Sequence, residues 1–214
     1  MDLLIFDLDG TLIDSQLDLA YSVNATRAHM GMPPLPHETV FSYVGNGAPV
    51  LVRRSLGPSA SDADVERGLA YFLQYYREHM LDNTTLYPGV RETLDAFRAA
   101  GRQMAVLTNK PVRFSEGIVA GLGLESHFFR IYGGNSFEQK KPDPIGIDTL
   151  LRESGLERER AMMIGDSAVD VRTARNANVK AVGVTYGFQP ESLVAEPPDI
   201  LLHHMAELVP IVLG

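Results

Sequence analysis

The sequence predicts an α/β protein in which a doubly wound, mainly parallel sheet carries a large helical insertion. One short apolar run stands near the amino end, and from residue 84 onward similar runs alternate with helix-length segments. Strands that alternate with helices form parallel βαβ units. The stretch between these regions shows helical periodicity alone. We therefore expect a core domain made of residues 1–14 and 84–214, and a helical domain made of residues 15–83.

The first strand is expected at residues 3–6, which read Leu-Leu-Ile-Phe. This run is too short for a core helix, and its apolar character predicts a strand that is buried on both faces in the middle of the sheet. Asp7 and Asp9 follow it on one face, about 6.6 Å apart, because alternate residues of an extended chain share a face. Gly10 permits a sharp turn, and Thr11 adds a hydroxyl group.

The helical insertion shows helix signals and no strand pattern. Ser15 can cap its first helix, which should end at Gly31, and prolines mark the loop that follows. The helices of this region are expected at residues 15–31, 37–44, 50–56 and 62–80. The aromatic residues Tyr71, Phe72, Tyr75 and Tyr76 are expected to form its core.

The rest of the chain alternates between strands and helices. Ligands of parallel sheets bind at the carboxyl ends of the strands. The chemistry should therefore lie on Asp7 and Asp9, on Thr108 and Asn109, and on Asp166, which directly follow expected strands. The strands are expected at residues 3–6, 104–107, 131–133, 161–164, 181–184 and 200–202, and the helices at residues 89–100, 112–121, 144–153 and 167–177.

Composition narrows the classes of partner. The 214 residues include 27 acidic and 19 basic ones, so the formal net charge is -8. Such a surface disfavours nucleic acids and anionic lipids as partners. The absence of cysteine excludes disulfides, thiolate zinc sites and a cysteine nucleophile. No apolar run is long enough for a membrane span. We expect a cytoplasmic monomer or homodimer that acts on a small molecule.

Distant segments supply the residue types that phosphoryl transfer needs. Asp7 and Asp9 would repel each other unless a cation lay between them, and a divalent cation relieves this cost. Lys141 stands between prolines just before a helix, which can hold its ammonium group in place. Asp166 and Asp170 are one helical turn apart, and carboxylate oxygens suit Mg²⁺.

Each of these signals also has a structural interpretation. Two acids before a glycine are common in surface turns, as is Thr108 followed by Asn109. A Lys-Lys-Pro segment at Lys141 can be a solvated surface. Asp166 can cap a helix that has Asp170 in its first turn. The combination of all these features in one chain favours a single site over four unrelated ones.

Four segments of the chain resemble the motifs of the haloacid dehalogenase-like (HAD) hydrolases. Residues 7–12, Asp-Leu-Asp-Gly-Thr-Leu, resemble the first motif, and Thr108, Lys141 and residues 166–170 resemble the other three in order. The resemblance covers the whole chain. It implies a Rossmann-like core, a helical C1 cap at residues 15–83, and Mg²⁺ as the cofactor.

The resemblance also implies a role for each residue. Asp7 would be the nucleophile that carries an aspartyl-phosphate, and Asp9 the general acid and base. Lys141 would offset the charge of Asp7 and the phosphate. Mg²⁺ would be held by Asp7, the backbone carbonyl of Asp9 and Asp166, with Asp170 binding it either directly or through a neighbouring ligand.

The same resemblance narrows the reaction. Dehalogenases of this fold lack the second aspartate, so Asp9 disfavours dehalogenation, and Thr11 is more typical of the phosphatases than of the mutases. Gly45, Asn46 and Gly47 lie in a loop that resembles the specificity loop of phosphoglycolate phosphatases, although an ordinary turn between helices would look similar. Residues 87–90, 108–110 and 133–135 show the same resemblance.

We therefore expect a Mg²⁺-dependent phosphatase of a small phosphorylated metabolite, with phosphoglycolate as the leading candidate. The alternatives are a hexose-phosphate mutase, another HAD phosphatase such as a pyrophosphatase or sugar phosphatase, and a phosphate-binding protein without turnover. The last would have little need for both Asp7 and Asp9. The expected substrate-binding residues are Gly10, Thr11, Thr108, Asn109, Lys141, Gly45, Asn46 and Gly47.

Overall fold

The computed structural model describes all 214 residues and divides them into two compact units. Met1–Asp14 and Leu86–Gly214 form the first, which we call the sheet unit. Ser15–Thr85 form the second, which we call the helical unit. The second boundary falls two residues after the expected one.

Six parallel strands form the sheet of the sheet unit, in the order β5-β4-β1-β6-β7-β8. β1 lies between β4 and β6, with Ile5 aligned to Ala105 on one side and to Met163 on the other. All four β1 residues are fully buried, as the apolar run predicts. The α/β fold class is thus confirmed. The strands are β1 (Leu3–Phe6), β4 (Gln103–Leu107), β5 (Arg130–Tyr132), β6 (Ala161–Gly165), β7 (Lys180–Val184) and β8 (Ile200–Leu202).

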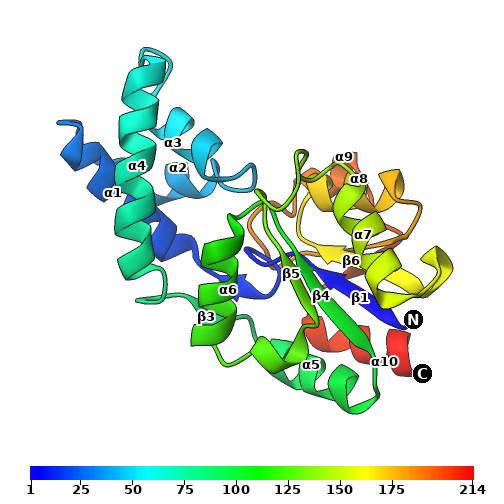
Figure 1. Cartoon of the computed structure of the whole chain (residues 1–214). Helices are drawn as coiled ribbons and strands as arrows, with labels where there is room; N and C mark the ends of the chain where they lie inside the picture. Colours follow the sequence, from blue (N-terminus) through cyan, green and yellow to red (C-terminus); the bar gives the residue numbers. More distant parts are fainter. The chain divides into compact units, whose positions relative to one another are not determined.

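Helices cover both faces of this sheet. Figure 1 shows α7 and α8 on one side and α5 and α10 on the other. Leu3 and Ile5 belong to a buried cluster with Leu150 of α7 and Val171 of α8. Phe6, on the opposite face, meets the Phe128 ring edge-on at 6.4 Å between centroids. The helices are α5 (Val90–Ala99), α6 (Val112–Gly121), α7 (Ile145–Ser154), α8 (Ala168–Asn176), α9 (Ser192–Ala195) and α10 (Leu208–Leu213).

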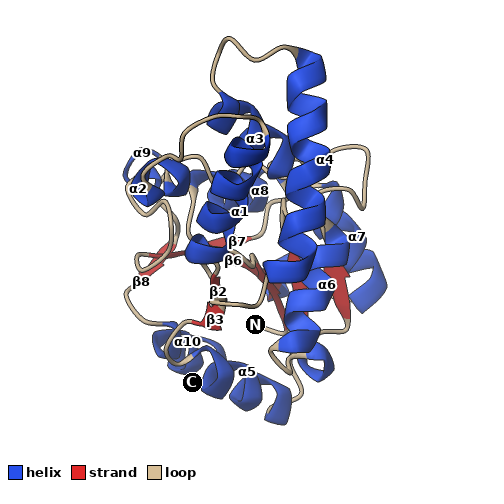
Figure 2. Cartoon of the chain, turned by 90° about the vertical axis from the view of Figure 1, so that its left-hand side faces the viewer, coloured by secondary structure: helices blue, strands red, loops and turns tan.

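The helical unit consists of four helices joined by loops (Figure 2). A capping box begins α4, in which Ser61 and Asp64 each bind the other's backbone N–H. Phe72 and Tyr76 of α4 are buried, as expected for core residues. None of the helices in the chain combines the length and apolar character needed to cross a bilayer. The four are α1 (Gln16–His29), α2 (His37–Phe41), α3 (Ala48–Leu56) and α4 (Asp62–His79).

Some elements differ from expectation. β2 (Ile13–Asp14) and β3 (Thr85–Leu86) form a separate two-stranded sheet that the sequence does not predict, because two residues carry no periodic signal. Tyr71 and Tyr75, expected in a core, are only half-buried and stack on each other. α9, α10 and three short 3₁₀ helices at Glu125–His127, Arg158–Arg160 and Met205–Glu207 were also not expected.

Candidate active site

Asp7 stands where β1 ends, at the carboxyl edge of the sheet. Its Oδ1 accepts a 2.7 Å hydrogen bond from the Leu8 N–H and lies 3.0 Å from Lys141 Nζ. Burial raises the pKa of Asp7 to about 6, against the opposing effect of Lys141, and the Asp170 carboxylate adds to the rise. Asp7 is therefore a nearly buried carboxylate with one ammonium group beside it.

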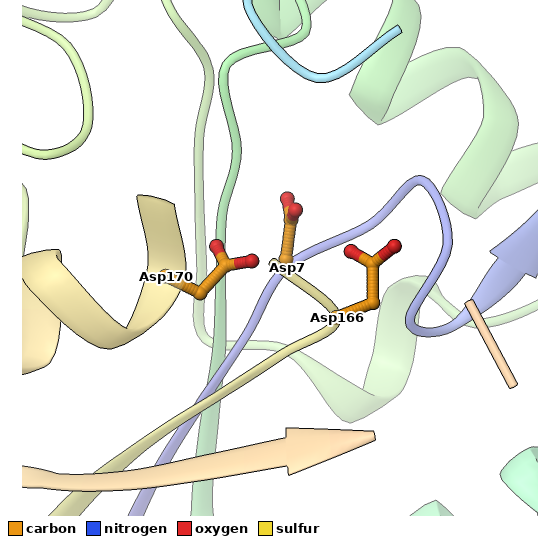
Figure 3. A group of neighbouring side chains, drawn as sticks. All are labelled: Asp7, Asp166 and Asp170. Atoms are coloured by element: carbon orange, nitrogen blue, oxygen red, sulfur yellow. The ribbon is translucent and has the colours of Figure 1, made fainter. Parts of the chain in front are cut away.

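Three carboxylates from different elements converge at this edge. Figure 3 shows Asp7 after β1, Asp166 after β6 and Asp170 in the first turn of α8, with their carboxylates facing a common space. One oxygen of each lies within 4.8 Å of the others. Burial raises the pKa of Asp166 well above its usual range, and the charges of Asp170 and Asp7 raise it further. A divalent cation would relieve this repulsion, so the donor set fits Mg²⁺.

Asp170 orients the lysine of the site. Its Oδ1 lies 2.6 Å from Lys141 Nζ, and its Oδ2 accepts hydrogen bonds from the Ser167 hydroxyl at 2.7 Å and N–H at 3.1 Å. Burial alone would lower the pKa of Lys141, but Asp170 and Asp7 outweigh it and the pKa is raised. Only Asp170 belongs to α8, because Ser167 caps that helix and Asp166 precedes it.

Three glycines let these groups approach one another. A Cβ at Gly165 would lie 2.1 Å from Asp170 Cγ, and one at Gly10 would lie 2.3 Å from Asp166 Oδ2. Gly10 also has φ +82°, as its expected sharp turn requires. Gly187, which the sequence did not single out, has no room for a Cβ either, since this atom would lie 2.3 Å from Asp166 Cβ. A side chain at any of these three positions would therefore collide with Asp166 or Asp170.

The loop after Gly187 fixes one side of Asp166. Asp166 Oδ2 accepts hydrogen bonds from the Phe188 N–H at 2.6 Å and the Gln189 N–H at 3.2 Å. These bonds oppose the rise in the pKa of Asp166. They hold one carboxylate oxygen to the backbone of the loop.

Thr108 and Asn109 follow β4 as expected and are buried. The Thr108 hydroxyl accepts a 3.3 Å hydrogen bond from the Lys110 N–H, and its side-chain hydrogen bond to Asp7 helps to lower the pKa of that acid. The Asn109 amide donates to the Lys141 carbonyl at 3.2 Å. Thr108 thus lies beside Asp7, whereas Asn109 holds the backbone of Lys141.

Asp9 has a different partner. Lys110 Nζ lies 2.9 Å from Asp9 Oδ1 and 3.0 Å from Oδ2. Lys110 belongs to the segment 108–110 that resembles phosphoglycolate phosphatases, but it was not predicted as a site residue. Its position two residues after Thr108, at the carboxyl end of β4, was the signal that could have found it.

Thr11 completes the turn after β1. It is fully buried and its hydroxyl has no hydrogen-bond partner, while its carbonyl accepts a 3.0 Å bond from the Tyr186 hydroxyl. The Tyr186 ring lies 4.7 Å from that of Tyr87, and burial raises the pKa of both tyrosines. Tyr87 belongs to the segment 87–90 that resembles phosphoglycolate phosphatases, but it was not predicted as a site residue. Tyr186 was not expected, because no local pattern links the loop after β7 to this turn.

The other expected residues belong to the helical unit. Gly45, Asn46 and Gly47 lie between α2 and α3. Gly45 and Gly47 have φ values of 112° and 85°, which glycine adopts readily, and Gly47 caps α3. This explains the glycines locally, and a role in substrate binding stays a prediction.

Comparison with known proteins decides the family. The family model for the haloacid dehalogenase-like hydrolases matches residues 4–184 of the sequence. This range contains every acid of the site. The chain is a haloacid dehalogenase-like hydrolase. The family that the sequence resembles is thus confirmed, as is the expectation that the protein is an enzyme.

Several relatives of this HAD hydrolase are named phosphoglycolate phosphatase. A phosphoglycolate phosphatase from Chromobacterium violaceum is 41% identical over 95% of this chain and 92% of its own. One from Pseudomonas putida is 41% identical over 97% of this chain and 78% of its own. A crystal structure of a predicted phosphoglycolate phosphatase from Haemophilus somnus has a TM-score of 0.93 and 32% identity, and covers 99% of this chain and 97% of its own.

Proposed function

We propose that this HAD hydrolase is a Mg²⁺-dependent phosphatase of a small phosphorylated metabolite, with phosphoglycolate the leading candidate. The observation that carries the proposal is the convergence of Asp7, Asp166, Asp170 and Lys141 at one sheet edge. The name shared by relatives about 40% identical supports the choice of substrate.

We propose Asp7, Asp166 and the backbone carbonyl of Asp9 as the Mg²⁺ ligands. When bound, the cation would offset the negative charge of the phosphate and of Asp7. Asp170 is better assigned to holding Lys141, because both of its oxygens already accept hydrogen bonds or contact the ammonium group.

The reaction would proceed in two displacements. A carboxylate oxygen of Asp7 attacks phosphorus, the bond to the leaving oxygen breaks, and Asp9 gives that oxygen a proton. Water then attacks the aspartyl-phosphate, Asp9 takes back a proton, and the bond between phosphorus and Asp7 breaks. Phosphate leaves, and both aspartates return to their starting forms.

The other residues of the sheet edge would bind the phosphoryl oxygens. Lys141 brings a positive charge to Asp7, and Thr108 brings a hydroxyl beside it. The Thr11 hydroxyl is a buried group without a partner, which a further polar ligand would satisfy. Gly10 and Asn109 would act through the backbone of the two turns that they shape.

We propose that residues 15–83 are a cap that covers this site and selects the substrate. Gly45, Asn46 and Gly47 would meet the part of the substrate that is not phosphate, because backbone N–H groups beside glycine can approach a small carboxylate closely. Closure would exclude bulk water during the reaction. The chain would work in the cytoplasm as a monomer or homodimer.

A panel of phosphate esters, incubated with and without Mg²⁺, tests the proposal. We expect phosphate release that requires Mg²⁺ and is fastest with phosphoglycolate, and no release by Asp7→Asn. A hexose-phosphate mutase would instead yield an isomer, and a binding protein would release no phosphate. If a pyrophosphate or a sugar phosphate is hydrolysed faster than phosphoglycolate, the protein is still a phosphatase, but that compound replaces phosphoglycolate as the proposed substrate.

A further inference from the structure

Two of the four lysines in the chain are buried, and both face the first motif. Lys140 and Lys180 are exposed, whereas the side chains of Lys110 and Lys141 are 4% and 2% exposed. Buried lysines are rare and need an anionic partner. Each of these two contacts a different one of the two aspartates that follow β1. The HAD reaction accounts for Lys141 but leaves Lys110 without a role.

Lys110 contacts Asp9 through both carboxylate oxygens, at 2.9 and 3.0 Å. A contact to one oxygen would leave the carboxylate free to rotate, whereas a contact to both restricts its rotation as well as its place. The Asp9 side chain is still 15% exposed, so the pairing does not seal it from a reactant.

The backbone of Lys110 is itself held in place. Its N–H donates to the Thr108 hydroxyl at 3.3 Å, and its carbonyl accepts a 2.9 Å bond from the Gly134 N–H. A Cβ at Gly133 would lie 2.6 Å from that carbonyl oxygen, so the two loops touch backbone to backbone. The ammonium group therefore extends from a fixed point to Asp9.

We propose that Lys110 is the positioning residue for Asp9, holding its carboxylate where it exchanges protons with the leaving oxygen and the attacking water. Lys141 does not replace it, because the contacts of Lys141 are to Asp7 and Asp170. This inference rests on the proposed phosphatase function, in which Asp9 is the acid and base. Because the Lys110 ammonium group contacts both oxygens of Asp9, it fixes the position of this carboxylate, and proton transfer depends on such positioning.

Burst kinetics with p-nitrophenyl phosphate test this role. Its good leaving group needs little protonation, so phosphorylation of Asp7 can proceed while the hydrolysis step still needs Asp9. For Lys110→Met we expect a burst of nitrophenol close to one per active site, followed by a steady-state rate about 10- to 100-fold below wild type. Lys180→Met, at the amino end of β7, is the matched control and should match wild type.

A double-mutant cycle separates positioning from a general structural effect. In the Asp9→Asn background, Lys110→Met should change the steady-state rate by less than about 2-fold, because the group that it positions is gone. An equal fold loss in both backgrounds would overturn the proposal, as would an unchanged rate or the loss of the burst in Lys110→Met. Should Lys110→Met not fold, Lys110→Gln gives the same test.

The same assay distinguishes failure of the inference from failure of the function. Wild type with neither a burst nor Mg²⁺-dependent turnover would overturn the phosphatase, and the role of Lys110 with it. Normal wild-type turnover that slows in Asp9→Asn, together with additive effects of Lys110→Met, would overturn the role of Lys110 alone.

Discussion

Asp7 and Asp9 are two residues apart, yet their surroundings differ. Asp7 faces two further carboxylates and shares Lys141 with one of them. Asp9 has Lys110 on both of its oxygens. Acids therefore outnumber the cation around Asp7, whereas Asp9 lies opposite an ammonium group of its own.

This contrast suggests how one residue type can serve two functions. The excess of negative charge around Asp7 favours a cation and a phosphoryl group at that position, which fits a nucleophile beside a metal. The paired carboxylate of Asp9 fits a group that must be held still for proton transfer. The two lysines, drawn from different loops, create the difference.

Removing the proposed nucleophile should have the largest effect. Asp7→Asn keeps the shape of the side chain but cannot form an aspartyl-phosphate, so we expect turnover to fall by about 10³-fold or more. Phosphate release from phosphoglycolate measures it. Substantial Mg²⁺-dependent activity in this variant would rule out the covalent route.

Of the two buried lysines, Lys141 should contribute more to stability than Lys110. Lys141→Met leaves Asp7 and Asp170 buried without their cation, and we expect a loss of about 3–5 kcal/mol in the free energy of unfolding. Lys110→Met should cost less, because the Asp9 carboxylate that it contacts is 15% exposed and can still be solvated. Urea denaturation compares them, with exposed Lys140→Met as the control. Equal losses would contradict the contrast between the two acids.

The buried carboxylate of Asp18 sharpens the comparison, because the groups that donate hydrogen bonds to it are neutral. Asp18 of α1 accepts hydrogen bonds of 2.8–3.0 Å from the backbone and side chains of Asn83 and Thr84. Asp18→Asn turns an amide toward these donors and should cost about 1–3 kcal/mol. Asp62→Asn, on an exposed carboxylate of the same unit, should stay within about 0.5 kcal/mol. Equal melting temperatures for Asp18→Asn and Asp62→Asn would contradict a structural role for Asp18.

The pH dependence of stability should reveal the burial of Asp7, which is the main cause of its raised pKa. Its pKa is raised to about 6, so metal-free protein gains stability from protonated Asp7 at low pH and loses it as the pH rises through 6. Asp7→Asn should therefore be more stable than wild type at pH 8 by roughly 1 kcal/mol or more, with the gain vanishing near pH 4. Mg²⁺ should raise the melting temperature of wild type at pH 8. A gain that does not depend on pH would contradict this assignment.

The fold could be predicted to the extent that its elements carry long or strongly apolar patterns. β1 and α4 show this, since an apolar run and a capped amphipathic segment specify them locally. β2 and β3 could not be found, because strands of two residues have no periodicity.

The candidate site could be predicted where a residue directly follows a strand. Asp7, Thr108 and Asp166 satisfy that rule, and the sheet order brings them to one edge. The bond from Lys110 to Asp9 could not be derived, because it joins residues 101 apart through side-chain reach alone. The close approach of Gly187 to Asp166 depends in the same way on a loop path that no local pattern encodes.

Mapping the covalent intermediate tests the central claim most directly. Asp9→Asn, mixed with p-nitrophenyl phosphate and Mg²⁺, is quenched in acid and treated with borohydride, which reduces an aspartyl-phosphate to homoserine. Peptide mass spectrometry should then find homoserine at position 7 and at no other aspartate. A reduced residue elsewhere, or none at all while phosphate is still released, would contradict the assignment of Asp7 as the nucleophile.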